Sequence, residues 1–467
     1  MNAVQAIGRI PLSAILVAAL VLRTGYSLVL YWNFGDDGLI GLDSIDYLRS
    51  SREFATAMSN GAVSGWQLLG PNLHMMPLFT WLLAVCFAVG GAAGPLMYVI
   101  VQGGLDTATC LIVYHIAGHF DRRFAIPAIV AAAVNPTQIV LAGLVYSDTP
   151  FVFFAALSLF ASLRWLKSPS LANAVLLGVG LSAAALFRIL IVPWAGLSIV
   201  FLALAILWQD RSQFRRIARL AVPALIVAIC IGPIMARNYT QYGAFALTPQ
   251  SGMHLTRWVV PLVKEAADGS PWEQTYLLME KRTEARFGPL TGNPFENSRR
   301  YVEIGNEAML ELGLRPALKG WSYGAAINVA APALLISPPV AQLPRTGFFS
   351  TPGRDMPEKI FNFVFRSDNA RYAQLLLIGL AGVFLVRLIQ VAGVIAVLQT
   401  RHFAALFFCA TWIAYVLLIN GPVASPKYRL PLEPLFDVLT GAGIAAIIGR
   451  KRLSPPGTPG SVNYSTG

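Results

Sequence analysis

The stretch PLSAILVAALVLRTGYSLVLYW, residues 11–32, decides the fold class of this chain. It carries one charged side chain, Arg23, and it is long enough to cross a bilayer as a helix, which takes about 20 apolar residues. Arg9 is the only charged side chain before it, and no small-residue cleavage site follows it. We therefore expect a retained membrane helix and not a signal peptide.

The composition extends this interpretation to the whole chain. Of its 467 residues, 56% are hydrophobic and 12% are charged, whereas soluble proteins carry about 25% charged residues. So few charges cannot cover a water-soluble globule, and 26 Phe, 15 Tyr and 10 Trp exclude a disordered chain. The formal charge of +12 fits basic cytoplasmic loops better than nucleic-acid binding, because no basic run is interleaved with aromatic residues. We expect an all-α polytopic membrane protein.

Ten apolar stretches predict membrane helices, and the short basic loops between them indicate the topology. All of these loops fall on one side, as the positive-inside rule expects, if 75–93 is an interfacial or re-entrant helix of an outer loop. The stretch 323–341 is treated alike, because Pro332, Pro338 and Pro339 oppose a straight span. Both chain ends are then cytoplasmic. The ten stretches are roughly 11–32, 95–117, 125–143, 150–166, 171–187, 189–208, 218–236, 372–397, 403–420 and 431–448.

This topology leaves two large outer segments, residues 33–94 and 237–371, and long loops of this kind usually carry function. Residues 1–448 form one membrane domain, and 449–467, rich in Pro, Gly and Ser, are expected to be a disordered cytoplasmic tail. No internal repeat is visible, which weakens a transporter interpretation. The four cysteines lie in apolar stretches without metal-ligand spacing and are interpreted as small hydrophobic residues: Cys86, Cys110, Cys230 and Cys409.

The first outer segment concentrates acids in GDDGLIGLDSIDYLRSSREFA, residues 35–55. A helical pattern starts at Ser44, so Asp43 is either the cap of that helix or a functional carboxylate. The short second outer loop, AGLVYSDTPFVFF at 142–154, holds a lone acid, Asp148. This acid is either another helix cap or a partner for a metal, a hydroxyl or a sugar. The pattern alone leaves both alternatives open.

Four cations are predicted on the outer side, where positive charge is not the rule. They suggest an anionic ligand, with ordinary lipid headgroups as the alternative. Within the membrane, Arg23 and Asp106 are expensive to bury and are expected to pair as a structural tie. The four outer cations are Arg188, Arg237, Lys427 and Arg429.

Six short motifs follow one another in a fixed order along the chain. They are DSIDYLRSSREFA (43–55), PNLHMMPLFTWLLA (71–84), NPTQIVLAGLVYSDTPFVFF (135–154), LFRILIVP (186–193), ARNYTQYGAFALTPQSG (236–252) and SPKYRLPLEPLFDVL (425–439). This series resembles the polytopic glycosyltransferases of the GT-C fold over roughly residues 10–448. The bacterial relatives of protein O-mannosyltransferases and of the lipid A aminoarabinose transferase resemble it most. The fixed order across ten spans is more specific than any single motif.

The resemblance implies roles for particular residues. Asp43 would be the general base near the donor, with Asp46 and Asp37 as competing assignments. Asp148 would be the second acid, which orients the reacting groups. His74 stands where relatives often carry a basic residue before the proline, and it would contact phosphate only when protonated. The other expected contacts are Tyr47 with substrate, and Arg188, Arg237, Lys427 and Arg429 with the donor phosphate. The outer segment 33–94 would be catalytic, and the outer segment 237–371 would lie on the acceptor side.

The implied reaction moves a hexosyl or pentosyl group from a polyprenyl-phosphate carrier to a glycan, lipid or protein on the outer face of a plasma (bacterial inner) membrane. A carboxylate accepts the acceptor's proton, cations stabilise the departing phosphate, and one displacement inverts the anomeric centre. A divalent cation near Asp43 and Asp148 is compatible with this set; no nucleic acid is expected as a partner. The alternative is a transporter or flippase of a lipid-linked sugar. Such a protein would use the outer cations to bind the phosphate but would catalyse no transfer of the sugar.

Overall fold

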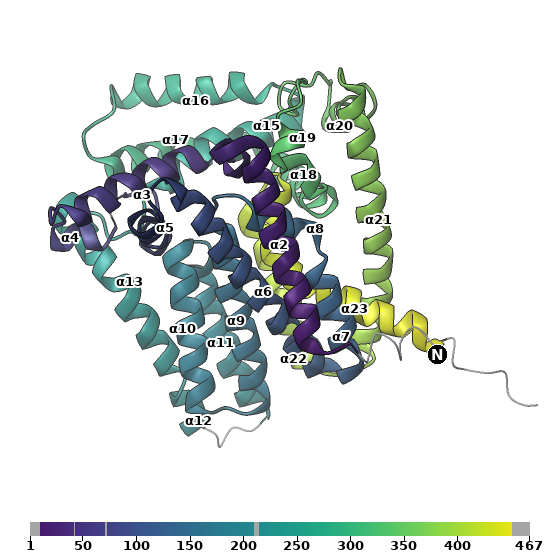
Figure 1. Cartoon of the computed structure of the whole chain (residues 1–467). Helices are drawn as coiled ribbons and strands as arrows, with labels where there is room; N and C mark the ends of the chain where they lie inside the picture. The colour runs from purple at the N-terminus through teal and green to yellow at the C-terminus, as the bar shows by residue number, and fades with distance from the viewer. Residues whose placement is uncertain (1–9, 42, 71, 210–213, 451–467) are drawn as a thin grey trace, which may run out of the picture.

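The computed structural model describes residues 10–41, 43–70, 72–209 and 214–450, and all regular structure in that part of the chain is helical. Long helices gather into a bundle, and further helices lie across one end of it (Figure 1). We call this end the upper end, as it is oriented in Figure 1. The predicted disordered tail lies, from residue 451 onward, outside the described residues.

Each of the ten predicted spans corresponds to a helix or to a bent pair of helices. The bounds are α2 (Leu12–Phe34), α6 (Gly94–Phe120), α7 (Arg122–Ala133), α8 (Pro136–Ala142), α9 (Asp148–Lys167), α10 (Leu171–Phe187), α11 (Ile191–Gln209), α13 (Ala221–Tyr242), α21 (Ala370–Leu398), α22 (Phe403–Asn420) and α23 (Glu433–Arg450), with a short α12 (Phe214–Ala218) before α13. Eight helices among the described residues are long and apolar enough to cross a membrane, and the bent pair α7–α8 makes a ninth. The tenth candidate, α10, is a shorter apolar helix of 17 residues that packs against α9 and α13.

The segment at 75–93 is too short to form a full span. Its helix α5 (Pro77–Gly90) has 14 residues, about 21 Å at 1.5 Å per residue, whereas a bilayer core is about 30 Å thick. The chain then turns at Gly91, whose φ of 54° favours glycine, and passes through η2 (Gly91–Ala93) into α6. α5 packs against α3 (Ser44–Ser59). The depth of α5 in the membrane stays a prediction.

Prolines interrupt the stretch 323–341, as predicted. α18 (Leu314–Ala330) ends two residues before Pro332, and η4 (Ala333–Ile336) and α19 (Pro338–Ala341) follow as separate short pieces, which excludes a straight span. The other elements of the upper end are η1 (Gly35–Leu39), α4 (Gly65–Leu68), α14 (Gln250–His254), η3 (Leu255–Val259), α15 (Val260–Asp268), α16 (Trp272–Phe287), α17 (Pro294–Leu312), α20 (Met356–Phe365) and η5 (Pro426–Leu432).

The bend of 46° between α7 and α8 interrupts the series of helical hydrogen bonds inside the bundle. Arg23 of α2 donates to two carbonyls at the break, with Nη1 2.9 Å from the carbonyl oxygen of Ala133 and Nη2 3.0 Å from that of Ala132. The Ala132 carbonyl also accepts the Asn135 amide N–H at 3.3 Å. Its Nε donates to the Asp106 carboxylate at 2.6 Å, and both side chains are buried. The predicted tie between Arg23 and Asp106 is confirmed, and it also satisfies the broken helix.

On the other side of the bend, Asn135 caps α8 and joins it to α23. Its Oδ1 accepts the Thr137 amide N–H at 2.9 Å, and its Nδ2 lies 2.9 Å from both Glu433 Oε2 and Asp437 Oδ1. Gln138 Nε2 donates to the other Asp437 oxygen at 3.1 Å. Buried polar contacts from α2 and α23 therefore hold the bent pair in place.

Replacing Arg23 by Met should destabilise the protein by about 3–5 kcal/mol, because the change leaves the buried Asp106 carboxylate without its cation and the Ala133 carbonyl without its Arg23 donor. Thermal unfolding of the detergent-solubilised protein measures the loss. Arg49→Met is the matched control, since Arg49 pairs with Asp46 at 2.5 Å where the side chains are 66% and 67% exposed. Exposed pairs of this kind contribute up to about 1 kcal/mol. Equal losses in the two variants would contradict the assigned role of Arg23.

Candidate active site

Hydrogen bonds join the two loops that hold the predicted acids. The Val145 amide donates to the Leu39 carbonyl at 2.9 Å, and Ser44 Oγ donates to the Val145 carbonyl at 2.9 Å. The Gly41 amide donates in turn to Ser44 Oγ at 2.8 Å. The segment before α3 and the segment before α9 are therefore held against each other, and each leads to an acid.

Asp43 occupies the N-cap position of α3, yet its side chain makes no capping hydrogen bond. Its Oδ2 forms an ion pair with Nζ of Lys427, which lies in η5, the segment before α23. The Asp43 side chain is 46% exposed and the Lys427 side chain 12%, so the carboxylate is open to a ligand. Of the two alternatives for Asp43, these contacts favour the functional carboxylate over the helix cap.

Asp148 begins α9, where the positive end of the helix dipole favours a carboxylate. Its Oδ2 lies 2.8 Å from Arg188 Nη1, and the same nitrogen lies 3.4 Å from Ser147 Oγ. Arg188 directly follows α10, so the break between α10 and α11 places the guanidinium beside the start of α9. The side chains of Asp148 and Arg188 are 5% and 23% exposed, which makes this pair the more buried of the two.

The two ion pairs lie close enough to influence each other. Burial alone would raise the pKa of Asp43, but Lys427 and, more weakly, Arg188 hold this pKa below its ordinary value of 3.8. Burial raises the pKa of Tyr47, whose phenol is also within electrostatic reach of both ion pairs. The Tyr47 ring lies 4.6 Å from that of Phe79, centroid to centroid. Asp43 is therefore ionised and Tyr47 neutral at neutral pH.

Aromatic rings surround the Lys427 ammonium. Nζ lies 4.9 Å from the ring centroid of Tyr146 and 5.6 Å from that of Tyr428, distances at which cations and aromatic faces attract. Gly41 packs so closely on Tyr146 that a Cβ there would lie 1.8 Å from the phenol oxygen. Sequence reasoning missed Tyr146, although an aromatic residue two positions before the lone Asp148 was an available signal.

The competing acids of the first loop make other contacts. Asp46 pairs with Arg49 on the exposed face of α3. Asp37 lines an open cleft beside α3, together with Arg52 and other residues of that helix. The ion pair of Asp46 favours Asp43 over Asp46, whereas Asp37 is also open to a ligand, so the choice of Asp43 over Asp37 stays a prediction.

Arg429 is buried and engaged by the protein. Its Nε donates to Glu433 Oε1 at 2.5 Å, and its Nη2 donates to Thr137 Oγ1 at 2.7 Å. Its Nη1 lies 2.7 Å from the Ala331 carbonyl oxygen. Every side-chain nitrogen of Arg429 thus has a protein acceptor, and the residue is 2% exposed. These contacts do not support the predicted role of Arg429 at the donor phosphate.

Arg237 and His74 each connect parts of the upper end. Arg237 is buried, and its Nη1 donates to the Gly70 carbonyl at 2.7 Å, which joins α13 to the loop after α4. The carbonyl of the exposed His74 accepts a hydrogen bond from Gln250 Nε2 at 2.5 Å. Partial burial lowers the pKa of the His74 imidazole, so it is neutral at pH 7. The roles of both residues at a donor phosphate stay predictions.

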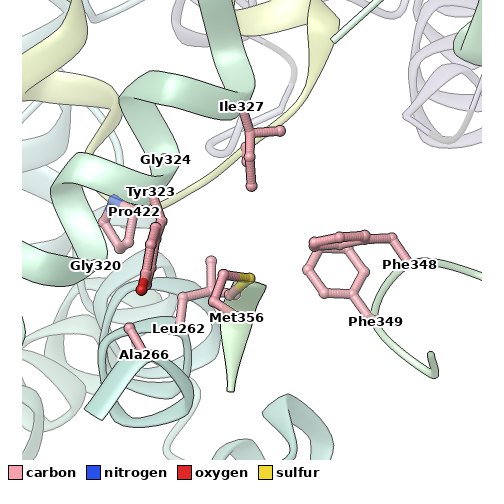
Figure 2. A pocket seen from close by; sticks show the side chains of 11 residues that line it. Leu262, Ala266, Gly320, Tyr323, Gly324, Ile327, Phe348, Phe349, Met356 and Pro422 are labelled. Atoms are coloured by element: carbon pink, nitrogen blue, oxygen red, sulfur yellow. The ribbon is translucent and has the colours of Figure 1, made fainter. Parts of the chain in front are cut away.

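A small apolar pocket lies beside the segment that leads to Lys427. Figure 2 shows Tyr323 and Ile327 of α18 on one side and Phe348 and Phe349 on the other. The Tyr323 hydroxyl is its one polar side-chain group. The rest of the lining consists of Leu262, Ala266, Gly320, Gly324, Met356, Pro422 and Ala424. The pocket is about the size of one water molecule, so it is too small for a lipid chain, and it is set apart from the two ion pairs by its apolar lining.

In the part of the chain that the structure describes, no three His, Cys, Asp or Glu side chains come together as a metal site would require. Asp43 and Asp148 each hold a cationic side chain. A divalent cation between them would have to compete with Lys427 and Arg188 for the carboxylate oxygens. Such a cation stays a prediction.

Replacing Gly41 by Ala should destabilise the protein by about 1–3 kcal/mol, because the added Cβ would lie 1.8 Å from the Tyr146 hydroxyl oxygen and would force the ring or the loop to move. Thermal unfolding of the solubilised variant measures the effect. Gly65→Ala serves as the control, since a Cβ at Gly65 meets open space. Unfolding of Gly41→Ala at the wild-type temperature would show that the two loops are not packed as described.

Neither a family model nor a curated protein matches the sequence. Among solved structures, the archaeal oligosaccharyltransferase AglB from Archaeoglobus fulgidus, in complex with an inhibitory peptide and a dolichol-phosphate, matches 94% of this chain and 50% of its own at 16% identity and a TM-score of 0.53. The structure of ArnT from Cupriavidus metallidurans bound to undecaprenyl phosphate matches 92% of this chain and 78% of its own, at 17% identity and a TM-score of 0.39. The structure of the same protein in the apo state matches 92% of this chain and 77% of its own, at 16% identity and a TM-score of 0.37. This chain spans half the length of AglB. The likeness to AglB concerns the fold alone, and the chain therefore has the GT-C fold.

Proposed function

We propose that the protein is a glycosyltransferase that moves a sugar from a polyprenyl-phosphate carrier to a glycan, lipid or protein acceptor on the outer face of the membrane. One observation carries this proposal: two carboxylate–cation pairs, Asp43–Lys427 and Asp148–Arg188, meet at the upper end of the bundle. A polyprenyl phosphate brings hydrocarbon for the bilayer and an anionic group for the two cations. The GT-C fold supports the same class of reaction.

Asp43 is the proposed general base. Its carboxylate is ionised and open to a ligand, as a proton acceptor must be. It takes the proton of the acceptor hydroxyl while that oxygen attacks the anomeric carbon of the sugar. Its low pKa makes it a weak base as long as Lys427 pairs with it. A turn of the Lys427 ammonium toward the donor phosphate raises the basicity of Asp43 at the moment it is needed.

The cations act on the leaving group. As the bond between the anomeric carbon and the phosphate oxygen breaks, negative charge grows on the polyprenyl phosphate, and Lys427 and Arg188 stabilise it. Asp148 fixes the Arg188 guanidinium through the 2.8 Å contact and acts as an orienting acid. A base on one side of the sugar and a departing phosphate on the other produce a single displacement with inversion, by analogy with inverting sugar hydrolysis.

The purified protein in detergent or nanodiscs, supplied with a labelled polyprenyl-phosphate sugar and membrane extract as the source of acceptor, should release free polyprenyl phosphate. Movement of the intact lipid-linked sugar across a vesicle membrane without release would instead favour the flippase. Mass spectrometry of envelope glycans, lipids and glycoproteins after deletion of the gene identifies the sugar and the acceptor.

Asp43→Asn should lower the rate of transfer by about 10²–10⁴-fold, the usual contribution of general base catalysis, because the amide cannot take up the proton. Release of polyprenyl phosphate measures the rate, and thermal unfolding shows that the variant is folded. Asp46→Asn is the matched control on the same helix and should keep its activity, since Asp46 pairs with Arg49 in solvent. Full activity of Asp43→Asn would refute the assignment of the base.

The pH dependence of transfer should report the ionisation of Asp43. The wild-type rate falls only as Asp43 becomes protonated, and its pKa lies below 3.8, so the acid limb lies below that pH. Lys427→Met removes the charge that lowers this pKa and leaves the burial that raises it, so the acid limb moves to higher pH. Profiles of kcat/KM for the donor measure the shift, with Arg49→Met as the unchanged control. If the acid limb of Lys427→Met lay at the same pH as that of the wild type, the pairing of Lys427 with Asp43 would be contradicted.

A further inference from the structure

Two buried asparagines hold the segment that carries Lys427. Asn420 Nδ2 donates to the Tyr428 carbonyl at 3.1 Å, directly after Lys427, and Asn328 binds the chain before it. Asn328 of α18 is 1% exposed, and its Nδ2 donates to the Val423 carbonyl at 3.0 Å while its Oδ1 accepts the Ser425 amide N–H at 2.7 Å. The carboxamide thus binds the backbone on both sides of residue 424 and replaces the partners that a regular helix would supply. Ser425 Oγ in turn accepts the Lys427 amide N–H at 3.3 Å, so hydrogen bonds connect Asn328 with the backbone of Lys427.

α18 also contacts the chain before this segment. Trp321 Nε1 donates to the Leu418 carbonyl at 3.0 Å, at the end of α22. Gly324 lies so close to the next turn that a Cβ would be 2.4 Å from the Gly421 carbonyl oxygen. Trp321, Gly324 and Asn328 lie three to four residues apart, on one face of α18, so this face follows the chain from the end of α22 toward Lys427.

Arg429 completes the arrangement from the other side of Lys427. Its Nη1 lies 3.2 Å from the carbonyl oxygen of Asn328 and 2.7 Å from that of Ala331, carbonyls at the end of α18. Contacts with Asn328 therefore hold the chain two residues before Lys427, at Ser425, and two residues after it, at Arg429. The Lys427 side chain itself makes its ion pair with Asp43.

We infer that Asn328 is a positioning residue, which sets the place of the Lys427 ammonium between the Asp43 carboxylate and the donor phosphate. The inference rests on the proposed function for what Lys427 does, but the positioning itself is a property of the fold. Because Asn328 belongs to the large segment 237–371, that segment takes part in building the donor site and does more than face the acceptor. A carboxamide is required, since the two backbone partners need one donor and one acceptor from the same side chain.

The test compares Asn328→Ala with Asn173→Ala in the reconstituted full-length protein. Asn173 is also a buried asparagine that supports a loop, with Nδ2 2.9 Å from the Ser168 carbonyl oxygen, next to the start of α10 and far along the chain from the site. Asn328→Ala should raise the KM for the polyprenyl-phosphate sugar roughly 10- to 100-fold, as expected when a charged contact is misplaced. It should also move the acid limb of kcat/KM to higher pH, as Lys427→Met does. Asn173→Ala should lower the unfolding temperature and leave both quantities at the wild-type value.

A double variant separates positioning from general destabilisation. In the Lys427→Met background, Asn328→Ala should have no further effect on the donor KM, because the ammonium it positions is gone. Asn328→Asp should not restore the wild-type KM, since a carboxylate offers no donor to Val423. The inference would be overturned if the donor KM of the double variant rose by the product of the two single effects. It would also be overturned if a folded Asn328→Ala protein kept the wild-type KM and the wild-type acid limb.

A cross-linking measurement works without any enzymatic activity. Cysteines placed at positions 43 and 427 should be joined by a short bifunctional maleimide when Asn328 is present, and several-fold more slowly after Asn328→Ala. If no polyprenyl phosphate is ever released but the cross-link depends on Asn328, the proposed function fails and the positioning stands. A cross-link that forms equally fast with and without the Asn328→Ala substitution would refute the positioning, whatever the activity.

Discussion

A broken helix inside a membrane must find polar partners for the backbone it exposes, and the rest of this bundle depends on how that need is met. The bend between α7 and α8 interrupts the helical hydrogen bonds, Arg23 donates to the Ala133 carbonyl at the break, and the charge of Arg23 in turn requires Asp106. Asn135 then ties the bend to α23. The bend thereby connects the first long helix with the last, and α8 leads directly into the loop that carries Asp148.

The same scarcity of polar partners shapes the upper end of the bundle. Each of the two central carboxylates, Asp43 and Asp148, is matched by one cation, so the resting cluster is close to neutral. In the proposed reaction, an entering donor phosphate meets cations that are already paired. It therefore competes with the Asp43 and Asp148 carboxylates for Lys427 and Arg188. Exchange of partners within a neutral cluster is therefore the physical basis of the proposed reaction.

Much of the fold could be predicted, because apolar stretches of membrane length and the prolines near 332 leave clear marks in the sequence. Asp43, Asp148, Arg188 and Lys427 could be found as single residues by their rarity and by the order of the motifs. Their pairing could not, since Asp43 and Lys427 are 384 positions apart. Arg429 lies two residues beyond Lys427 in a 3₁₀ turn, where side chains two positions apart point in different directions, so one reaches the site and the other the interior. The role of Asn328 could not be predicted either, because this residue is uncharged and belongs to none of the sequence motifs.

The separation of Asp43 from Lys427 also has a consequence during synthesis of the chain. A ribosome that adds about 5–20 residues per second needs roughly 20–80 s to proceed from one to the other. Asp148 and Arg188, 40 positions apart, are both made early in that interval, whereas the last cation emerges just before the final membrane helix. A nascent or truncated chain therefore holds both carboxylates but lacks Lys427, and the Asp43–Lys427 pair of the proposed site forms only when the chain is nearly complete.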